Sequence, residues 1–223
     1  MENSSIPPET CRLCLVRHGE TAWNTERRLQ GHLDIPLNET GLAQAAATAQ
    51  RLQALGHGFA ALYCSDLMRT RQTAAAIARQ QTLEVVHDER LRERHYGLFQ
   101  GLTYDEAEHR HPELYRRFKA REPDFGFPGH GESLIGFASR VHAALEDITG
   151  RHAGQAVLVV THGGVLDIAH RLASSAPLEA ARNFPIPNAA LNWIERTGER
   201  WRLLAWADEG HLGGGALDEL PNI

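Results

Sequence analysis

The run AVLVVT at residues 156–161 restricts the fold of this chain more than any other stretch. It carries no charge and is rich in valine, a β-branched residue that favours strands. A short, unbroken apolar run of this kind is typical of a strand buried on both faces of a sheet, with a layer of helices on either side. A second apolar run, at residues 12–17, has the same character. The sequence therefore predicts an α/β protein.

Strand-like and helical patterns alternate along the rest of the chain. The strand-like segments are 12–17, 60–64, 82–87, 156–161, 190–196 and 201–207. Helical spacing of apolar residues occupies 42–55, 67–80, 104–109, 112–120, 134–148 and 165–173, with Thr40 and Ser133 as the expected N-caps of two of these helices. Strands that alternate with helices indicate a three-layer α/β/α sandwich with a mostly parallel central sheet.

The chain has 223 residues, which suits one sizeable core, and no linker-like stretch divides it. We expect a single domain over residues 11–212. Residues 1–10, which include Pro7 and Pro8, and residues 213–223 show no periodicity and are predicted to be flexible tails. Two short helical patches fall within residues 103–131, which we expect to form a helical insertion on the substrate side of the domain.

Composition excludes several classes of partner. The net charge is -5 and the 23 basic residues are interspersed with 28 acidic ones, so the chain lacks the basic stripe that nucleic acid or an anionic membrane requires. No run is apolar and long enough to span a bilayer, and the first residues lack the pattern of a signal peptide, so a cytoplasmic location is expected. Cys11 and Cys14 form a C-x-x-C pattern, but within a strand they point to opposite faces and are predicted to be structural thiols.

The two most apolar strand-like runs both end in His-Gly. The first ends in Arg17-His18-Gly19 and the second in His162-Gly163. The carboxyl ends of parallel strands meet at one edge of a sheet, where ligands bind in open α/β folds. We therefore expect both imidazoles at one pocket.

Two further segments add charged groups to this edge. Arg69 lies at a strand-to-helix junction, and Glu93 lies among arginines in LRERHYG, residues 91–97. Guanidinium groups bind phosphoryl oxygens with paired hydrogen bonds, a neutral imidazole can attack phosphorus, and a carboxylic acid can protonate a leaving alcohol. A lone histidine at a strand end has a structural role more often than a catalytic one, but this combination favours phosphoryl transfer.

Other function classes find less support in the sequence. The chain has 13 histidines, but H-E-x-x-H is absent and no dense set of Asp and His suggests a metal-dependent hydrolase. Neither the nucleotide-binding loop G-x-x-x-x-G-K-[ST] nor the serine esterase motif G-x-S-x-G occurs. A non-catalytic module that binds phosphorylated ligands is a further alternative, but none of the expected catalytic groups is missing.

Five motifs occur in an order that resembles the histidine phosphatase superfamily, also called phosphoglycerate-mutase-like. They are L-x-R-H-G-E-T at 15–21, S-D-L-x-R-x-x-Q-T at 65–73, L-R-E-x-x-Y-G at 91–97, G-E-S at 131–133 and V-T-H-G-G at 160–164. The resemblance covers roughly residues 12–211. It implies the phosphoglycerate-mutase-like fold and a reaction that uses neither a metal nor a cofactor.

Carried over residue by residue, the resemblance implies that His18 is the phosphorylated nucleophile and Glu93 the proton donor, with His162 as a third catalytic residue. The implied phosphate-binding groups are Arg17, Asn24, Arg69 and the backbone N–H of Gly163. The implied substrate-binding set is Thr21, Gln30, Gly31, Tyr96, Arg116 and Arg117. For Glu132 and Ser133 we expect helix capping, and Arg71 is expected on a helix surface.

Phosphatases and mutases of this kind share one pocket. The segment HYGLFQGL at 95–102 is mutase-like, and Arg116 and Arg117 resemble the paired arginines with which mutases bind a substrate carboxylate, unless they are simply solvated. Against a mutase, Tyr104 stands where those enzymes have a lysine and Gly164 where they have asparagine. We therefore predict a metal-independent phosphomonoesterase that forms a phosphohistidine and acts on small phosphorylated metabolites, with a cofactor-dependent phosphoglycerate mutase as the alternative. No nucleic-acid or membrane partner is expected, and pairing into a homodimer is left open.

Overall fold

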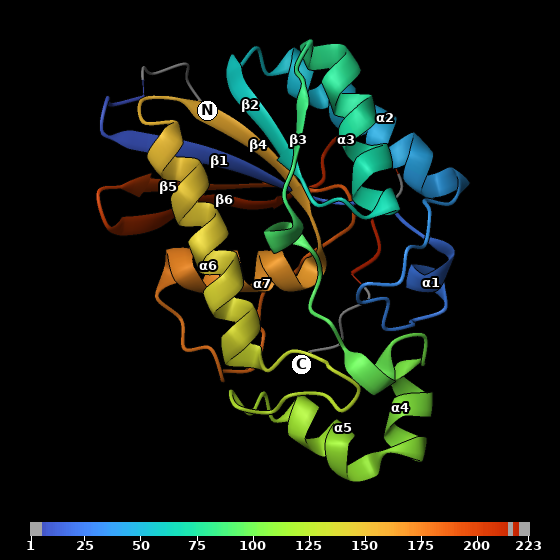
Figure 1. Ribbon diagram of the computed structural model, residues 1–223. Coiled ribbons are helices and arrows are strands. Elements are labelled where there is room, and N and C mark those ends of the chain that lie inside the picture. Colours follow the sequence, from blue (N-terminus) through green and yellow to red (C-terminus); the bar gives the residue numbers. More distant parts are fainter. Residues whose placement is uncertain (1–5, 214–215, 219–223) are drawn as a thin grey trace.

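The computed structural model describes residues 6–213 and 216–218. Its strands are β1 (Thr10–Arg17), β2 (Phe59–Cys64), β3 (Val85–His87), β4 (Ala156–Thr161), β5 (Leu191–Thr197) and β6 (Arg200–Asp208). Within these residues they form one six-stranded sheet in the order β3-β2-β4-β1-β5-β6 (Figure 1). The strands from β3 to β1 run parallel, and β5 and β6 are each antiparallel to the strand before them. The predicted mostly parallel sheet is confirmed.

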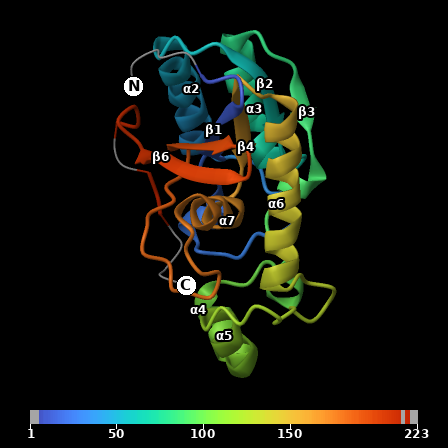
Figure 2. The ribbon, with the colours of Figure 1, turned by 90° about the vertical axis from the view of Figure 1, so that its left-hand side faces the viewer.

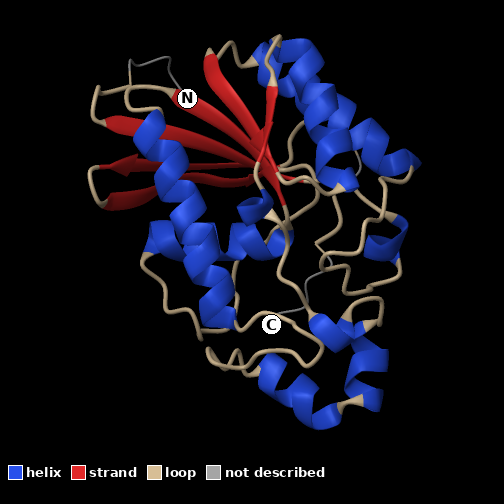
Figure 3. Ribbon diagram, viewed as in Figure 1, coloured by secondary structure: helices blue, strands red, loops and turns tan. Residues whose placement is uncertain are grey.

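Helices cover both faces of the sheet, as Figures 1 and 3 show. On one face lie α2 (Glu39–Ala54) and α3 (Met68–Gln81), and on the other lie α6 (Leu134–Arg151) and α7 (Gly163–Ser174). The short helices are α1 (Ala22–Thr25), α4 (Tyr104–Arg110) and α5 (Pro112–Lys119), and 3-10 turns occupy Glu89–Leu91 and Gly97–Phe99. Figures 1 and 2 both place α4 and α5 together at one end of the molecule, beyond α6 and α7.

Alternate side chains of the central strands enter two different cores. Leu13 and Leu15 of β1 pack with residues of α6 and α7, whereas Cys14 and Val16 pack with residues of α2 and α3. All four side chains are fully buried, which explains why residues 13–16 have no polar side chain on either face. Cys11 and Cys14 belong to different cores and are free thiols, as strand geometry predicts.

Several element boundaries differ from the sequence prediction, and two of these differences have a clear local cause. The N-cap of α2 is Asn38 and not Thr40, because the Asn38 side chain accepts the N–H of Gly41 at 2.8 Å. The strand predicted at 82–87 begins only at Val85, since Thr82 ends α3 in the left-handed conformation with a φ of 54°.

Both predicted tails are attached to the fold in part. Thr10 belongs to β1, and its hydroxyl oxygen lies 2.7 Å from that of Thr197. Near the other end, the N–H of Asn188 donates to the carbonyl of Leu217 at 3.2 Å. Within these tails, residues 1–5, 214–215 and 219–223 lie outside the described residues.

The register of β1 and β4 positions the candidate site. Arg17 is level with Thr161, and the N–H of His18 donates to the carbonyl of Thr161 at 2.9 Å. The two strands therefore end side by side, so His18 and His162 follow them at the same edge of the sheet. Gly19 then passes so close to α2 that a Cβ on it would lie 2.4 Å from a backbone carbonyl oxygen of that helix, an approach that only glycine permits.

Candidate active site

His18 has the tautomer that a nucleophile needs. Its Nδ1 lies 2.8 Å from the carbonyl oxygen of Gly19, and because a carbonyl oxygen only accepts, Nδ1 carries the proton. The lone pair is therefore on Nε2. Burial, together with the positive charges of Arg69 and Arg17, holds the pKa of His18 well below its usual value, so the ring stays neutral at neutral pH.

His162 lies next to His18 and is also buried. The centroids of the two rings are 5.3 Å apart in an edge-to-face arrangement. Burial and the positive charge of Arg69 hold the pKa of His162 well below its usual value. Its Nε2 lies 2.9 Å from the Ser65 hydroxyl oxygen, and its Nδ1 has no hydrogen-bond partner among the residues that the structure describes. The motif at 65–73 contains Ser65, yet the sequence analysis gives this serine no role.

Two arginines of the site are held by backbone carbonyl oxygens. Arg17 Nη1 donates to the carbonyl of Ile186 at 2.7 Å, and the Arg69 guanidinium donates to those of Gly31 at 2.8 Å and Leu33 at 2.9 Å. Both side chains are buried. Two buried guanidinium groups beside a neutral imidazole create a local positive potential, although the whole chain carries a net negative charge. The site therefore attracts an anion.

Glu93 enters the site from the segment that follows the first 3-10 turn. Its Oε1 accepts the N–H of Arg94 at 2.7 Å, and its Oε2 accepts the N–H of Gly164 at 3.0 Å. Burial raises the pKa of Glu93, and this effect outweighs the two hydrogen bonds, which lower it. A carboxyl group with a raised pKa is suited to donating a proton.

Gly164 leaves room for that carboxyl group. A Cβ at this position would lie 2.1 Å from Glu93 Oε1, far inside van der Waals contact. The position is therefore restricted to glycine as long as Glu93 keeps its place. The sequence analysis treats Gly164 only as a departure from mutases, whereas the structure supplies a steric reason for it.

The Arg140 side chain of α6 holds the segment that carries the Glu93 carboxyl group. Its guanidinium donates to three carbonyl oxygens of residues 90–93, at 2.7, 3.1 and 3.3 Å. It also forms an ion pair with Glu132 at 2.7 Å. Ser133 caps α6 as predicted, but Glu132 does not cap the helix, because its carboxylate is used by Arg140.

Six of the thirteen predicted site residues line one cavity. The residues around it are Arg17, His18, Arg28, Leu29, Gln30, Arg69, Glu93, Tyr96 and Tyr104. The sequence analysis missed Arg28 and Leu29. Arg28 reaches the cavity because it forms an antiparallel bridge with Thr103, a contact between distant segments that no local pattern reveals. This cavity is called the phosphate cavity below.

The residues predicted near the phosphate on the loop after β1 are buried and contact one another. Thr21 Oγ1 donates to Asn24 Oδ1 at 3.0 Å and accepts from Gln30 Nε2 at 2.9 Å. Thr21 is the N-cap of α1, and Asn24 completes the capping box. The carbonyl of Gly31 accepts a hydrogen bond from Arg69. These contacts shape the loop, and direct contact of the four residues with substrate stays a prediction, as does that of the Gly163 N–H.

Arg116 and Arg117 are not brought to the phosphate cavity. Both lie on α5, where Arg116 pairs with Glu113 at 2.9 Å and Arg117 pairs with Glu122 at 2.6 Å. Their side chains are 66% and 43% exposed, because α5 turns its aromatic residues inward and leaves these two on its outer surface. The predicted contact of both arginines with substrate finds no support in this arrangement. Arg71 is exposed on α3, as predicted.

Within residues 6–213 and 216–218, no three His, Cys, Asp or Glu side chains are grouped so that they could hold a metal ion. None of the helices described is both long and apolar enough to cross a bilayer.

The site therefore has the groups that phosphoryl transfer requires. The chain belongs to the histidine phosphatase superfamily, branch 1, whose family model matches residues 13–209. It is similar to phosphoglycerate mutase-like protein 4 of Arabidopsis thaliana, with 41% identity over 95% of this chain and 93% of that protein. It is also similar to the metal-independent phosphoserine phosphatase of Arabidopsis thaliana, with 39% identity over 95% of this chain and 87% of that protein.

A solved structure extends the comparison to the fold. Bacillus stearothermophilus YhfR matches with a TM-score of 0.82 and 34% identity, over 91% of this chain and 99% of that chain. The phosphoglycerate-mutase-like α/β fold is therefore confirmed. The predicted enzyme class, a phosphoric monoester hydrolase of the histidine phosphatase type, is confirmed by the family assignment and by the phosphatase among the relatives.

Proposed function

We propose that this protein is a metal-independent phosphomonoesterase that forms a phosphohistidine on His18 and acts on small phosphorylated metabolites. One observation carries the proposal: a neutral histidine with its lone pair on Nε2 shares a positively charged cavity with a protonatable carboxyl group. These groups supply the parts of a double displacement, which replaces one difficult reaction by two easier ones.

In the first step, His18 Nε2 attacks phosphorus. An N–P bond forms while the P–O bond to the leaving alcohol breaks, and Glu93 gives its proton to that oxygen. Arg17 and Arg69 bind the equatorial phosphoryl oxygens and stabilise the charge that develops there. The same guanidinium groups lower the pKa of His18, so its lone pair is available before substrate binds.

In the second step, water removes the phosphoryl group. Glu93, now a carboxylate, takes a proton from the water whose oxygen attacks phosphorus, and the N–P bond breaks. Inorganic phosphate leaves, and His18 and Glu93 return to their starting protonation states. When the Ser65 hydroxyl donates to Nε2 of His162, the ring proton lies on Nδ1, and His162 can then donate from Nδ1 to a phosphoryl oxygen.

A phosphoglycerate mutase is the second candidate, because one similar protein carries a mutase-like name. A mutase returns the phosphoryl group from His18 to another hydroxyl of the bound substrate. The chain lacks the mutase groups at two places on the site: Tyr104 lines the phosphate cavity where a lysine would stand, and Arg116 and Arg117 lie outside it. These observations favour the phosphatase. The cytoplasmic location and the homodimer stay predictions.

Hydrolysis of phenyl phosphate in excess EDTA tests the proposal. The wild-type protein is expected to keep its activity in the chelator, and His18→Ala to lose it by about 1,000-fold or more, because the nucleophile is gone. His142→Ala, at a half-exposed histidine of α6, is the matched control and is expected to behave as wild type. Undiminished turnover by His18→Ala would exclude the phosphohistidine, and loss of activity in EDTA would exclude metal independence.

A second assay separates the two candidate reactions. Incubation with 3-phosphoglycerate is followed for release of free phosphate and for formation of 2-phosphoglycerate. The phosphatase proposal expects phosphate release to be faster. Interconversion of the two phosphoglycerates that outpaces phosphate release would reverse our order of the candidates.

A further inference from the structure

The loop between α7 and β5 holds both the side chain and the backbone of Arg17. The carbonyl of Ile186 accepts from Arg17 Nη1 at 2.7 Å, and the N–H of Ala189 donates to the carbonyl of Arg17 at 3.0 Å. Ile186 and Ala189 are both fully buried. We call residues 182–189 the clasp. Because Arg17 is one of the two proposed phosphate-binding arginines, the clasp sets the orientation of a group that meets the phosphate.

Asn188 extends the clasp to the proposed nucleophile. Its side-chain Nδ2 donates to the carbonyl of His18 at 2.9 Å, and the residue is fully buried. That carbonyl belongs to the peptide unit between His18 and Gly19, and the next carbonyl along the chain, that of Gly19, accepts from the Nδ1–H of the His18 ring. Fixing the first peptide unit therefore places the acceptor that keeps the lone pair of the ring on Nε2.

Two features of the clasp cost free energy. Asn188 Oδ1 is buried and has no hydrogen-bond partner among the described residues, and Ala189 has a φ of 60°, in the left-handed region that residues with a side chain adopt rarely. Such features persist where the surrounding structure enforces them, and here the Thr48 hydroxyl of α2 donates to the carbonyl of Ala189 at 3.0 Å. A residue that only filled space at position 188 would need no amide group. The unpaired oxygen therefore indicates that the position requires the donor side of the amide, which contacts His18.

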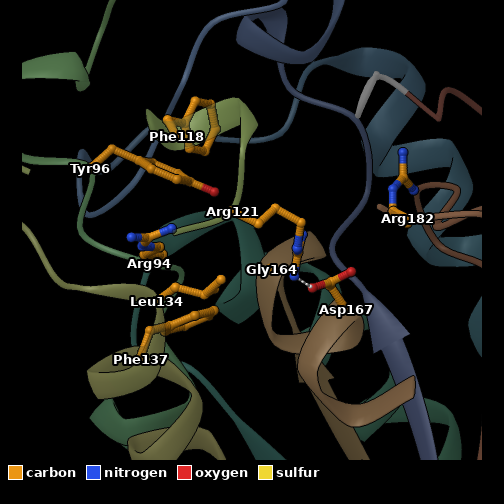
Figure 4. Close-up of a pocket in the computed structure, with 9 residues that line it drawn as sticks. All are labelled: Arg94, Tyr96, Phe118, Arg121, Leu134, Phe137, Gly164, Asp167 and Arg182. Atoms are coloured by element: carbon orange, nitrogen blue, oxygen red, sulfur yellow. Dashed lines mark hydrogen bonds and ion pairs between the residues drawn. The ribbon is translucent and has the colours of Figure 1, made fainter. Parts of the chain in front are cut away.

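Asp218 attaches the clasp to the rest of the fold. Its carboxylate forms an ion pair with Arg182 at 3.2 Å and accepts the N–H of Ile186 at 3.2 Å. Arg182 is buried, and Figure 4 shows it at one side of a cavity that Gly164 also lines. Asp218 thus contacts the residue whose carbonyl holds the Arg17 guanidinium.

We propose that Asn188 and Asp218 are positioning residues of the phosphatase site. Through the clasp, Asn188 orients the His18 ring for attack on phosphorus. Asp218 secures the Ile186 carbonyl that aims Arg17 at the phosphate. The inference rests on the proposed function and adds to it two residues that touch neither the substrate nor the reacting atoms. Because attack and phosphate binding are common to all phosphate esters, both residues act whatever the leaving alcohol is.

Replacing Asn188 by alanine tests its effect on His18. Asn188→Ala is expected to lower kcat/KM by about 10- to 100-fold, the range between loss of one hydrogen bond and displacement of a reacting group by about 1 Å. The loss is expected to be equal for an alkyl phosphate and for 4-nitrophenyl phosphate, because His18 attacks both. A loss confined to the alkyl phosphate would place the effect at Glu93 and refute this role of Asn188.

A second substitution separates donation from packing. Asn188→Leu fills nearly the same space without a donor and is expected to lose as much activity as Asn188→Ala. A leucine variant with wild-type kcat/KM would show that position 188 only fills space, which overturns the proposal. The leucine variant also covers the case in which the smaller alanine does not fold.

Asn192→Ala is the matched control. Asn192 of β5 is also fully buried, and its side-chain amide also donates to a carbonyl of β1, that of Leu15, at 3.1 Å. Leu15 belongs to the core between the sheet and the helices α6 and α7, so the control removes the same kind of hydrogen bond away from the site. We expect it to lower the thermal unfolding midpoint, as Asn188→Ala does, and to keep the kcat/KM of wild type. Equal loss of activity in both variants would overturn the proposal.

Inorganic phosphate is the probe for Asp218. Asp218 is partly exposed, so Asp218→Ala is expected to fold. Its inhibition constant for phosphate, measured against phenyl phosphate hydrolysis, and its dissociation constant for phosphate, measured by calorimetric titration, are both expected to rise by about 10-fold, because the hold on Arg17 is loosened. An unchanged affinity for phosphate would refute the role of Asp218.

Asp208→Ala is the matched control for this variant. Asp208 also pairs with an arginine, Arg51, at 3.4 Å and also accepts a backbone N–H, that of Gly210, at 3.1 Å, but it contacts no residue of the clasp. Its affinity for phosphate is expected to equal that of wild type. A loss as large as that of Asp218→Ala would overturn the assignment.

Phenyl phosphate separates failure of this inference from failure of the proposed function. If the wild-type protein hydrolyses phenyl phosphate through His18 while Asn188→Ala and Asp218→Ala match it, the positioning roles are refuted and the phosphatase stands. If the wild-type protein hydrolyses no ester, the phosphatase itself is refuted and this inference falls with it.

Discussion

Replacing Gly164 by alanine tests the position of the proposed proton donor. The new Cβ would lie 2.1 Å from Glu93 Oε1, 3.1 Å from Glu93 Cδ and 3.2 Å from a ring carbon of Phe137. Ordinary contact requires the carboxyl group to retreat by about 1 Å or more. Because the obstructing atoms are the end of a side chain, the fold can absorb this movement, but the hydrogen bond from the Gly164 N–H to Oε2 is strained or lost.

The cost of Gly164→Ala depends on the leaving group. Misplacing a catalytic group by about 1 Å can lower a rate by about 100-fold, which is also the lower end of what a general acid contributes. An alkoxide needs that proton in order to leave, whereas 4-nitrophenolate does not. We therefore expect kcat/KM for an alkyl phosphate to fall by about 100-fold and kcat/KM for 4-nitrophenyl phosphate to fall by less than about 10-fold.

The assay compares kcat/KM values, because these report the phosphorylation step alone, before water enters. Gly150→Ala is the matched control: it is also a helical glycine, but nothing lies within 4 Å of the added Cβ, so the kinetics are expected to stay as in wild type. Thermal unfolding verifies that both variants are folded. Equal losses for the two substrates, or none, would refute the steric link between Gly164 and proton donation.

Three further predictions concern the histidines and the acid. Ser65→Ala is expected to lower kcat/KM by about 10-fold, because His162 loses the hydroxyl that can hold its proton on Nδ1. Ser65→Thr keeps a hydroxyl and is expected to restore most of the activity. An alanine variant as active as wild type would contradict this role of Ser65. Because burial raises the pKa of Glu93, its acid form is lost as pH rises through that pKa, and kcat/KM for alkyl phosphates should fall on the alkaline side. Glu93→Gln should remove this alkaline fall and lower kcat/KM by about 100-fold or more. If the alkaline fall remains in Glu93→Gln, another group causes it. Since burial and nearby arginines lower the pKa values of His18 and His162 in the folded state, protons bind these rings more readily in the unfolded chain. Stability measured by denaturant titration should therefore fall as pH drops from 6.5 to 5.5, and the fall should be smaller in His18→Gln. An equal fall in His18→Gln would contradict the lowered pKa of His18.

The fold could be predicted where the chain repeats one physical requirement along a whole segment. The runs at 12–17 and 156–161 are apolar because helices cover both faces of the strands, and this requirement is visible residue by residue. The start of α2 could not be chosen, since Asn38 and Thr40 are both good N-caps. Asn38 is selected because its amide also donates to Glu20 Oε1 at 2.8 Å, a contact with the loop after β1.

The phosphate end of the site was predictable, and the other end was not. Arg17, His18 and Arg69 occupy strand ends or strand-to-helix junctions, whose meeting place follows from the topology alone. Arg28 belongs to none of the motifs, and it reaches the phosphate cavity only through its bridge with Thr103, which depends on tertiary packing. Arg116 was overrated for the same reason, because a charged pattern on a helix does not reveal that its partner is the adjacent Glu113.

The two proposed reacting groups, His18 and Glu93, are held in place in different ways. His18 stands at the end of a central strand of a closely packed sheet, whereas Glu93 belongs to an irregular segment whose carbonyls are held by side chains. Arg140 of α6 contacts three of these carbonyls, and Thr161 and His32 also donate to carbonyls of this segment. A central strand tolerates little adjustment, but a segment held by side chains can shift with the helix that carries one of them. Evolutionary change along α6 can therefore re-aim the acid toward a different leaving oxygen while the attack on phosphorus is left as it was.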